Sequence, residues 1–92
     1  MDVNLGQVVY SIAGRDSGRV LVVVEIIDDN NVLVSDGDLR PIEKAKKKKK
    51  KHLKVTEKVI LPLNEKFRTG ERVSNSEIRK AITQLEINRC KT

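Results

Sequence analysis

The amino-acid sequence predicts a small, mostly β domain with one C-terminal α-helix. Residues 19–28 are rich in valine and isoleucine, which favour β-strands. Groups of glycine, aspartate and asparagine separate this stretch from other apolar stretches, a pattern typical of turns. An apolar stripe with helical spacing follows only after residue 74. The length of 92 residues corresponds to a single domain.

The first half of the chain predicts three strands. Residues 7–13 alternate between two faces, and the glycine-bounded residues 14–18 form a turn in which positive φ is permitted. Residues 19–28 alternate poorly, so both faces of this strand should be buried, as in a small barrel. The turn formers at 28–31 and the strand at 32–35 complete a hairpin.

Further along the chain the strand signals are weaker. Residues 39–43 contain Pro41, which suits an edge strand or the start of a strand. Residues 52–63 predict another strand, ended by Pro62. Residues 64–73 are expected to form a loop with little burial.

A capping box predicts where the helix begins. Ser74 is the expected N-cap and Glu77 reaches back to it. The helix, at about 74–88, should dock its apolar stripe on the strands; this stripe comprises Ile78, Ala81, Ile82 and Leu85. We therefore expect a barrel at 1–63, including a basic segment at 44–54, and a loop with a packed helix at 64–92.

The basic charge of the chain is concentrated in one segment. Lysine and arginine number 19 against 13 acids, for a net charge of +6. Residues 44–54 hold eight lysines and no acid, whereas the rest of the chain holds 11 basic and 13 acidic residues. Such a segment predicts a polyanionic partner, because each lysine near a phosphate releases a counterion. The alternative is a solvated loop without a ligand.

Other classes of protein are poorly supported. Tyr10 and Phe67 are the only aromatic residues, too few for a platform that stacks bases. The single Cys90 favours a reducing compartment, and the first residues do not resemble a signal peptide, so we expect a cytoplasmic protein. The longest apolar run, 20–27, is shorter than the roughly 20 residues that span a bilayer.

No arrangement for catalysis or for a cofactor is evident. His52 is the only histidine, and the sequence indicates no group that would orient it as a general base. Four aspartates lie in two separate turns, where local hydrogen bonds explain them better than a metal does; they are Asp28, Asp29, Asp36 and Asp38. We therefore expect neither an enzyme nor a metal site.

The turn after the first strand is the most specific candidate for a binding site. Arg15 and Arg19 lie beside Gly14 and Gly18, so two guanidiniums accompany a backbone that can approach a phosphate or ribose closely. The alternative is an ordinary hairpin loop.

These residues carry a family resemblance. Residues 6–9 (GQVV) and 13–19 (AGRDSGR), followed by the valine-rich strand, resemble the KOW motif of ribosomal and transcription-factor proteins, and Gly18 lies at its signature glycine. Three more blocks lie at 24–34, at the basic run into His52-Leu53, and at 76–80. With them, residues 5–85 are similar to the archaeal and eukaryotic large-subunit ribosomal protein family fourteen-E and its small bacterial KOW-domain relatives.

The resemblance implies an SH3-like barrel of about five strands with one C-terminal helix. It also implies binding to structured RNA, in particular ribosomal RNA of the large subunit. With the charge pattern, it predicts an RNA-binding set of Gly14, Arg15, Gly18, Arg19, Lys44, Lys46, Lys47, Lys48, Lys49, Lys50, Lys51, His52 and Lys54. Ribosomal proteins are further candidate partners, and we expect a monomer in the absence of RNA.

Two other functions stay open. The first is a KOW module that binds proteins of the translation or transcription machinery. The second is a peripheral membrane protein that uses its lysines. The second class normally adds an amphipathic helix with basic residues and bulky apolar anchors, or a lipid, and the helix here has only a narrow stripe. We therefore expect no membrane partner.

Overall fold

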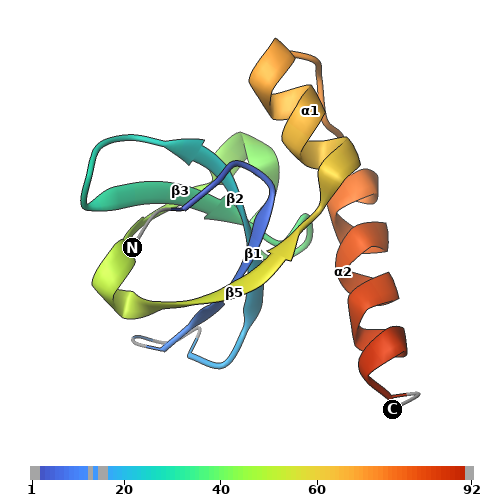
Figure 1. The fold of residues 1–92 in the computed structure, drawn as a ribbon, viewed down its shortest axis with the longest axis horizontal. Coiled ribbons are helices and arrows are strands. Elements are labelled where there is room, and N and C mark those ends of the chain that lie inside the picture. The colour runs from blue at the N-terminus through green and yellow to red at the C-terminus, as the bar shows by residue number, and fades with distance from the viewer. Residues whose placement is uncertain (1–2, 13, 15–16, 91–92) are drawn as a thin grey trace.

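The computed structural model describes residues 3–12, 14 and 17–90, with the backbone alone for 85–90. Along these residues, five strands precede two α-helices (Figure 1). The strands are β1 (Gln7–Ser11), β2 (Val20–Ile26), β3 (Asn31–Ser35), β4 (Lys46–Lys49) and β5 (Leu53–Val59). The helices are α1 (Leu61–Thr69) and α2 (Asn75–Cys90), and the 3₁₀ helices η1 (Ile42–Lys44) and η2 (Lys50–His52) flank β4. The prediction of a mostly β fold is confirmed.

The strands form one antiparallel sheet in the order β4-β3-β2-β1-β5. Its two edges, β4 and β5, are consecutive in the chain and are joined by the three residues of η2. This short link brings the edges towards one another, so the sheet curls (Figure 1), consistent with a small SH3-like barrel. Register shifts in β1–β5 and β2–β3 fit this curvature, because bulges bend strands.

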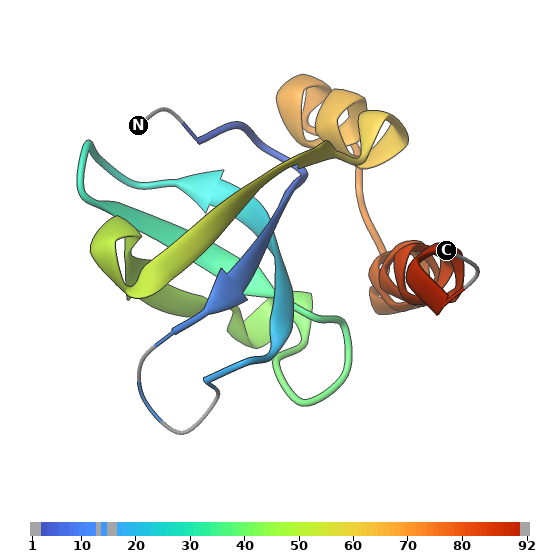
Figure 2. The same ribbon diagram turned by 60° about the horizontal axis from the view of Figure 1, so that its bottom comes forward.

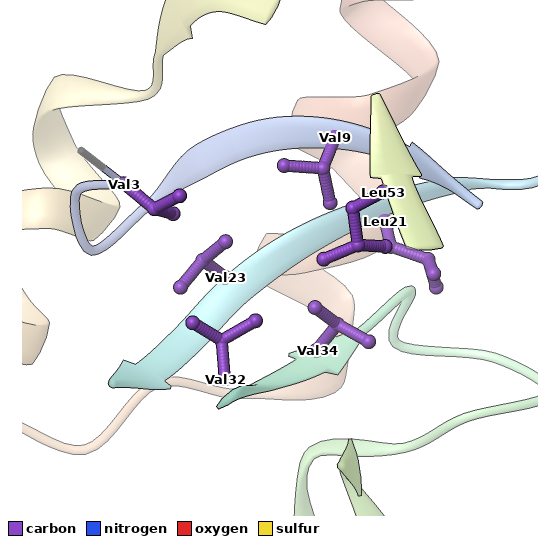
Figure 3. Packing of buried hydrophobic residues seen from close by; sticks show 7 residues of the cluster. All are labelled: Val3, Val9, Leu21, Val23, Val32, Val34 and Leu53. Carbon is purple, nitrogen blue, oxygen red and sulfur yellow. The ribbon is translucent and has the colours of Figure 1, made fainter. Parts of the chain in front are cut away.

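The first core cluster fills the interior of the barrel. Figure 3 shows its side chains converging from β1, β2, β3 and β5 and from the segment before β1; they are Val3, Val9, Leu21, Val23, Val32, Val34 and Leu53. Each of them is buried. Removing this much branched apolar surface from water is the main source of the barrel's stability.

Strand β2 buries both of its faces along its first half, as its poor alternation predicts, whereas Glu25 and Ile26 at its end are exposed. Leu21 and Val23 face the interior of the barrel, whereas Val22 packs against the helices, and none of the three is accessible to solvent. The second core cluster therefore lies between the sheet and the helices; it comprises Val22, Leu63, Val73, Ile78 and Ile82. Both helices lie to one side of the barrel (Figure 2).

Helix α2 begins at the predicted capping box. The backbone N–H of Glu77 donates to Ser74 Oγ over 3.2 Å, and the N–H of Ser74 donates to Glu77 Oε2 over 2.8 Å. Ile78 and Ile82 of the predicted stripe are buried against the sheet, and Ala81 packs beside them. The docking of the helix on the strands is therefore confirmed for the side chains described.

Helix α1 replaces the end of the predicted strand at 52–63 and most of the predicted loop at 64–73, so both predictions were wrong there. Pro62 lies in the first turn of the helix, where its missing N–H leaves no helical bond unmade. Gly70 ends the helix with φ +79°, in the left-handed conformation. Most of residues 64–73 are exposed, as expected, but Val73 is buried in the second core cluster.

Residues 39–43 do not form the predicted edge strand. Pro41 is extended but directly precedes η1. The carbonyl of Arg40 accepts hydrogen bonds from Ser35 Oγ over 2.6 Å and from the backbone N–H of Asp36 over 3.2 Å. Because these bonds close a tight loop, the carbonyl does not join a strand ladder. The edge strand is instead the lysine run itself, as β4.

Candidate nucleic-acid interface

The lysine-rich segment, residues 44–54, is an ordered part of the barrel. It runs from the end of η1 through β4 and η2 into the start of β5. Its basic residues differ in accessibility. The exposed ones are Lys44, Lys47, Lys49, Lys51 and Lys54, whereas Lys46, Lys50 and His52 are half-buried and Lys48 is buried. The segment therefore does not present a uniform row of charges.

The pairing of β4 with β3 fixes which lysines face inwards. Lys48 lies opposite Val32, and Lys46 lies opposite Val34. Both valines belong to the barrel core, and directly opposed residues share a face of a sheet. Lys46 and Lys48 therefore lie on the inner face of β4, and Lys48 is only 7% exposed.

The other two lysines of β4 lie on its outer face. Lys47 is opposite Leu33 and Lys49 is opposite Asn31. Both lysines are exposed, as the alternation of successive side chains between the two faces of a strand requires. Their ammonium groups are accessible to a polyanion.

The segment is tied to neighbouring elements by backbone hydrogen bonds. Lys50 N–H donates to the carbonyl of Asn30 over 2.8 Å, and Ile12 N–H donates to the carbonyl of His52 over 3.0 Å. Lys54 lies opposite Tyr10 in the β1–β5 pairing. The structure therefore brings the second half of the segment beside the end of β1, from which the predicted turn departs.

Glycine conformations shape the turn between β1 and β2. Gly14 has φ +85° and Gly18 has φ +88°, a region that other residues rarely adopt. Gly18 N–H donates to the carbonyl of Ser11 over 2.6 Å, and Ser17 N–H donates to the carbonyl of Gly14 over 3.3 Å. Arg15, predicted to contact RNA, lies outside the described residues.

Arg19 is held by a partner that the sequence analysis did not identify. Its Nη1 lies 3.1 Å from Oδ2 of Asp36, which is 8% exposed, while the Arg19 side chain is 38% exposed. The other carboxylate oxygen accepts the backbone N–H groups of Asp38 and Arg40, each over 2.9 Å. The guanidinium is therefore fixed near the turn while part of it stays accessible.

Asp36 keeps its charge in this setting. Burial by itself raises the pKa of Asp36, but the N–H groups of Arg40 and Asp38 and the guanidinium of Arg19 together outweigh it, and the pKa is lowered. The two residues are 17 positions apart in the sequence, so no local pattern predicts this pair. The one local signal was the Asp-Gly-Asp turn itself.

Asn75 anchors η1, which leads into the lysine-rich segment, to α2. Its Oδ1 accepts the N–H of Ile42 over 2.7 Å, and its Nδ2 donates to the carboxylate of Glu43. The side-chain hydrogen bond from Asn75 is the largest influence on the pKa of Glu43, which is lowered. The sequence placed Asn75 only between two residues of a capping box.

Two of the four turn aspartates, Asp28 and Asp36, form the predicted local hydrogen bonds. Asp28 Oδ1 accepts the backbone N–H groups of Asn30 and Asn31, each over 2.8 Å. Across the described part of the chain, no three histidine, cysteine, aspartate or glutamate side chains gather in a way that could hold a metal ion. Within that same part, neither helix has the length and apolar character needed to cross a membrane.

Comparison with known proteins gives consistent matches. The chain is 38% identical to the large ribosomal subunit protein eL14 of Desulfurococcus amylolyticus over 80 residues, covering 87% of this chain and 76% of the relative. It is 32% identical to the eL14 protein of Pyrobaculum aerophilum, covering 87% and 71%. The match to the eL14 protein of Staphylothermus marinus is 34% identical, covering 63% and 60%. No protein-family model matches the chain.

Proposed function

This chain belongs to the family of the large ribosomal subunit protein eL14, and we propose that it binds structured ribosomal RNA through its lysine-rich segment and the turn at 14–19. The relatives bear the name of a ribosomal protein and not of an enzyme, in agreement with the sequence, in which no catalytic arrangement is evident. A cytoplasmic location on the large subunit is part of the proposal.

One observation carries the proposal: five exposed lysines come from one continuous segment that contains no acid. Five of its lysines are exposed along η1, β4, η2 and β5. Lysine offers a compact charge without the planar fork of arginine, so it favours phosphates over base edges. The segment is therefore suited to holding an RNA backbone rather than to choosing bases.

The aromatic residues support structured RNA over single strands. Phe67 packs against the second core cluster, and Tyr10 is half-buried in β1. Neither ring forms part of a row on which successive bases could stack. Recognition through the shape and backbone of a helical or folded RNA needs no such row.

The turn contributes a different kind of contact. Asp36 orients Arg19, and a guanidinium can grip a phosphate with two parallel hydrogen bonds. We assign Gly14, Arg15, Gly18 and Arg19 the role of fixing the position of the protein on its RNA. The lysines supply the bulk of the affinity.

A protein-binding role is the second candidate, and exposed isoleucines favour it. Ile26 and Ile27 are adjacent at the end of β2, and each is more than two-fifths exposed. Apolar side chains beside the acidic Asp28 and Asp29 fit a basic protein partner. This function is compatible with RNA binding, because the acidic residues and the lysine-rich segment carry opposite charges and would bind different partners.

Salt dependence tests the main proposal. If the five exposed lysines contact phosphates, log affinity for purified large-subunit ribosomal RNA should fall with log salt at a slope of roughly −4 to −5. A slope shallower than about −2 contradicts phosphate contact by the segment. In a lysate, the protein should sediment with large subunits at low salt and leave them at high salt.

A matched pair of variants separates the segment from general charge. Lys47→Gln with Lys49→Gln removes two outward charges of β4. Arg68→Gln with Lys80→Gln removes the same charge from exposed positions on α1 and α2. The first pair should weaken RNA binding and flatten the salt slope by nearly two, whereas the second should change little. Equal effects of the two pairs contradict a role specific to the segment.

A further inference from the structure

Lys48 is a buried lysine on an edge strand. Its side chain is 7% exposed, and its Nζ donates to Oγ of Ser11 over 3.2 Å. Ser11 is itself only 1% exposed and is one of the groups that this ammonium contacts. Lysine is almost never buried without partners, and edge-strand lysines usually extend into water. The position of Lys48 therefore calls for an explanation of its own.

The contact joins two strands that are not neighbours in the sheet. Lys48 lies on β4 and Ser11 on β1, with β3 and β2 between them on one side and β5 on the other. The ammonium therefore reaches across the barrel at the seam where the edges β4 and β5 face one another. Backbone pairing with β3 holds β4 on its other side only.

We infer that Lys48 is a positioning residue for the RNA-binding surface and not an RNA contact. Its bond to Ser11 fixes β4 against β1, and the two-residue period of the strand then holds Lys47 and Lys49 outwards. The six consecutive lysines at 46–51 are therefore not interchangeable. This inference rests on the proposed function for its RNA readout, although the Lys48–Ser11 coupling is measured without RNA.

The energetics favour a bond that holds a position rather than one that simply adds stability. A buried ammonium loses its hydration, and this loss is offset only where hydrogen bonds replace it. A hydrogen bond from a charged donor is stronger than a neutral one, and the apolar stem of lysine can lie along the core lining. Removing either partner should therefore alter the effect of removing the other.

A double-mutant cycle tests the coupling. Lys48→Met keeps the length of the stem, Ser11→Ala removes the acceptor, and the two are then combined. Thermal melts of all four proteins should show that Ser11→Ala lowers the midpoint by several degrees in the wild-type background and by clearly less in the Lys48→Met background. Additive shifts contradict the inferred bond.

RNA titrations separate three roles for Lys48. They use purified large-subunit ribosomal RNA at a temperature where circular dichroism shows Lys48→Met to be fully folded. A positioning role predicts several-fold weaker binding with an unchanged salt slope. A direct phosphate contact predicts a slope shallower by about 0.9, and a purely structural role predicts unchanged affinity. Either of these two results overturns the inference.

Lys47→Met and Lys49→Met are the matched controls on the same strand. Each should flatten the salt slope by about 0.9, because each removes an outward charge, and each should leave the melting midpoint nearly unchanged. If neither changes RNA binding, the RNA-binding role of β4 fails, and the positioning role of Lys48 falls with it. The Lys48–Ser11 cycle would still report whether the bond across the seam exists.

Discussion

Arg79 of α2 donates a hydrogen bond from Nη1 to the backbone carbonyl of Gly37 over 2.8 Å, which joins the helix to the loop after β3. The loop and the helix approach so closely that a Cβ at Gly37 would lie 2.5 Å from the carbonyl oxygen of Asn75 and 3.1 Å from the Cβ of Ile78. Gly37 also has φ +73°. The seating of α2 on the barrel therefore depends on this glycine.

Gly37→Ala should destabilise the protein more than a glycine replacement without a close neighbour. Gly70→Ala is the control, because Gly70 has φ +79° and a Cβ there would have no atom within 4 Å. Both variants incur the strain of positive φ, about 1–2 kcal/mol. Gly37→Ala should lose roughly 1–3 kcal/mol more through overpacking, as measured by urea unfolding. Equal losses would show that the loop shifts freely away from α2.

Ser74→Ala should remove the N-cap of α2. The variant leaves the N–H of Glu77 without its acceptor, and the free energy of unfolding should fall by about 1 kcal/mol. Ser74→Asp, which keeps an oxygen at the same place, should retain most of the stability. A Ser74→Asp protein as unstable as Ser74→Ala would argue against capping as the cause.

Asp36→Asn should weaken the turn and alter the response to acid. Because the folded state lowers the pKa of Asp36 below its ordinary value of 3.8, the carboxylate contributes stability above that pH. This contribution is lost as the pH falls through the lowered pKa. The variant should be less stable at pH 7 and should lose less stability than wild type below about pH 4. Asp38→Asn, at an exposed neighbour in the same loop, controls for the lost charge.

Exchanging Arg15 and Arg19 for lysine tests whether the turn positions the protein. The exchange keeps every charge but removes the fork that makes paired hydrogen bonds. Affinity for large-subunit ribosomal RNA should fall, while binding to a scrambled duplex should stay nearly unchanged. Lys47→Gln with Lys49→Gln should weaken both by similar factors. If the arginine and lysine double variants change binding in the same way, the turn contributes only charge. Melting curves of the arginine double variant check that loss of the Arg19–Asp36 ion pair does not unfold the protein.

Local patterns predicted the elements whose signals are contained within a few residues. The capping box at Ser74 and Glu77 is three residues long, and both of its hydrogen bonds form. The poor alternation of residues 19–28 predicted a strand buried on both faces, and β2 is buried on both faces from Leu21 to Val23 but exposed at Glu25 and Ile26. In each case the determining chemistry lies next to the residue concerned.

Helix α1 shows where local patterns are ambiguous. Proline ends a strand but also begins a helix, so Pro62 alone does not distinguish the two. Burial of Leu63 in a cluster with Val22 and residues of α2 favours the helix over the strand. Gly6 adds a close approach, because a Cβ there would lie 2.8 Å from the backbone nitrogen of Asn64. Both contacts join parts of the chain that are far apart in sequence.

The sequence by itself determined that eight lysines and no acid occupy residues 44–54, and therefore that one part of this protein attracts polyanions. Only the tertiary structure decided which of these lysines can contact a polyanion. The pairing of Lys48 with Val32 turns Lys48 towards the core and Lys47 and Lys49 towards solvent. A shift of one residue in that pairing would exchange the two faces. Six identical side chains carry no information about register, so the apolar pattern of β3 and the contact with Ser11 supply it.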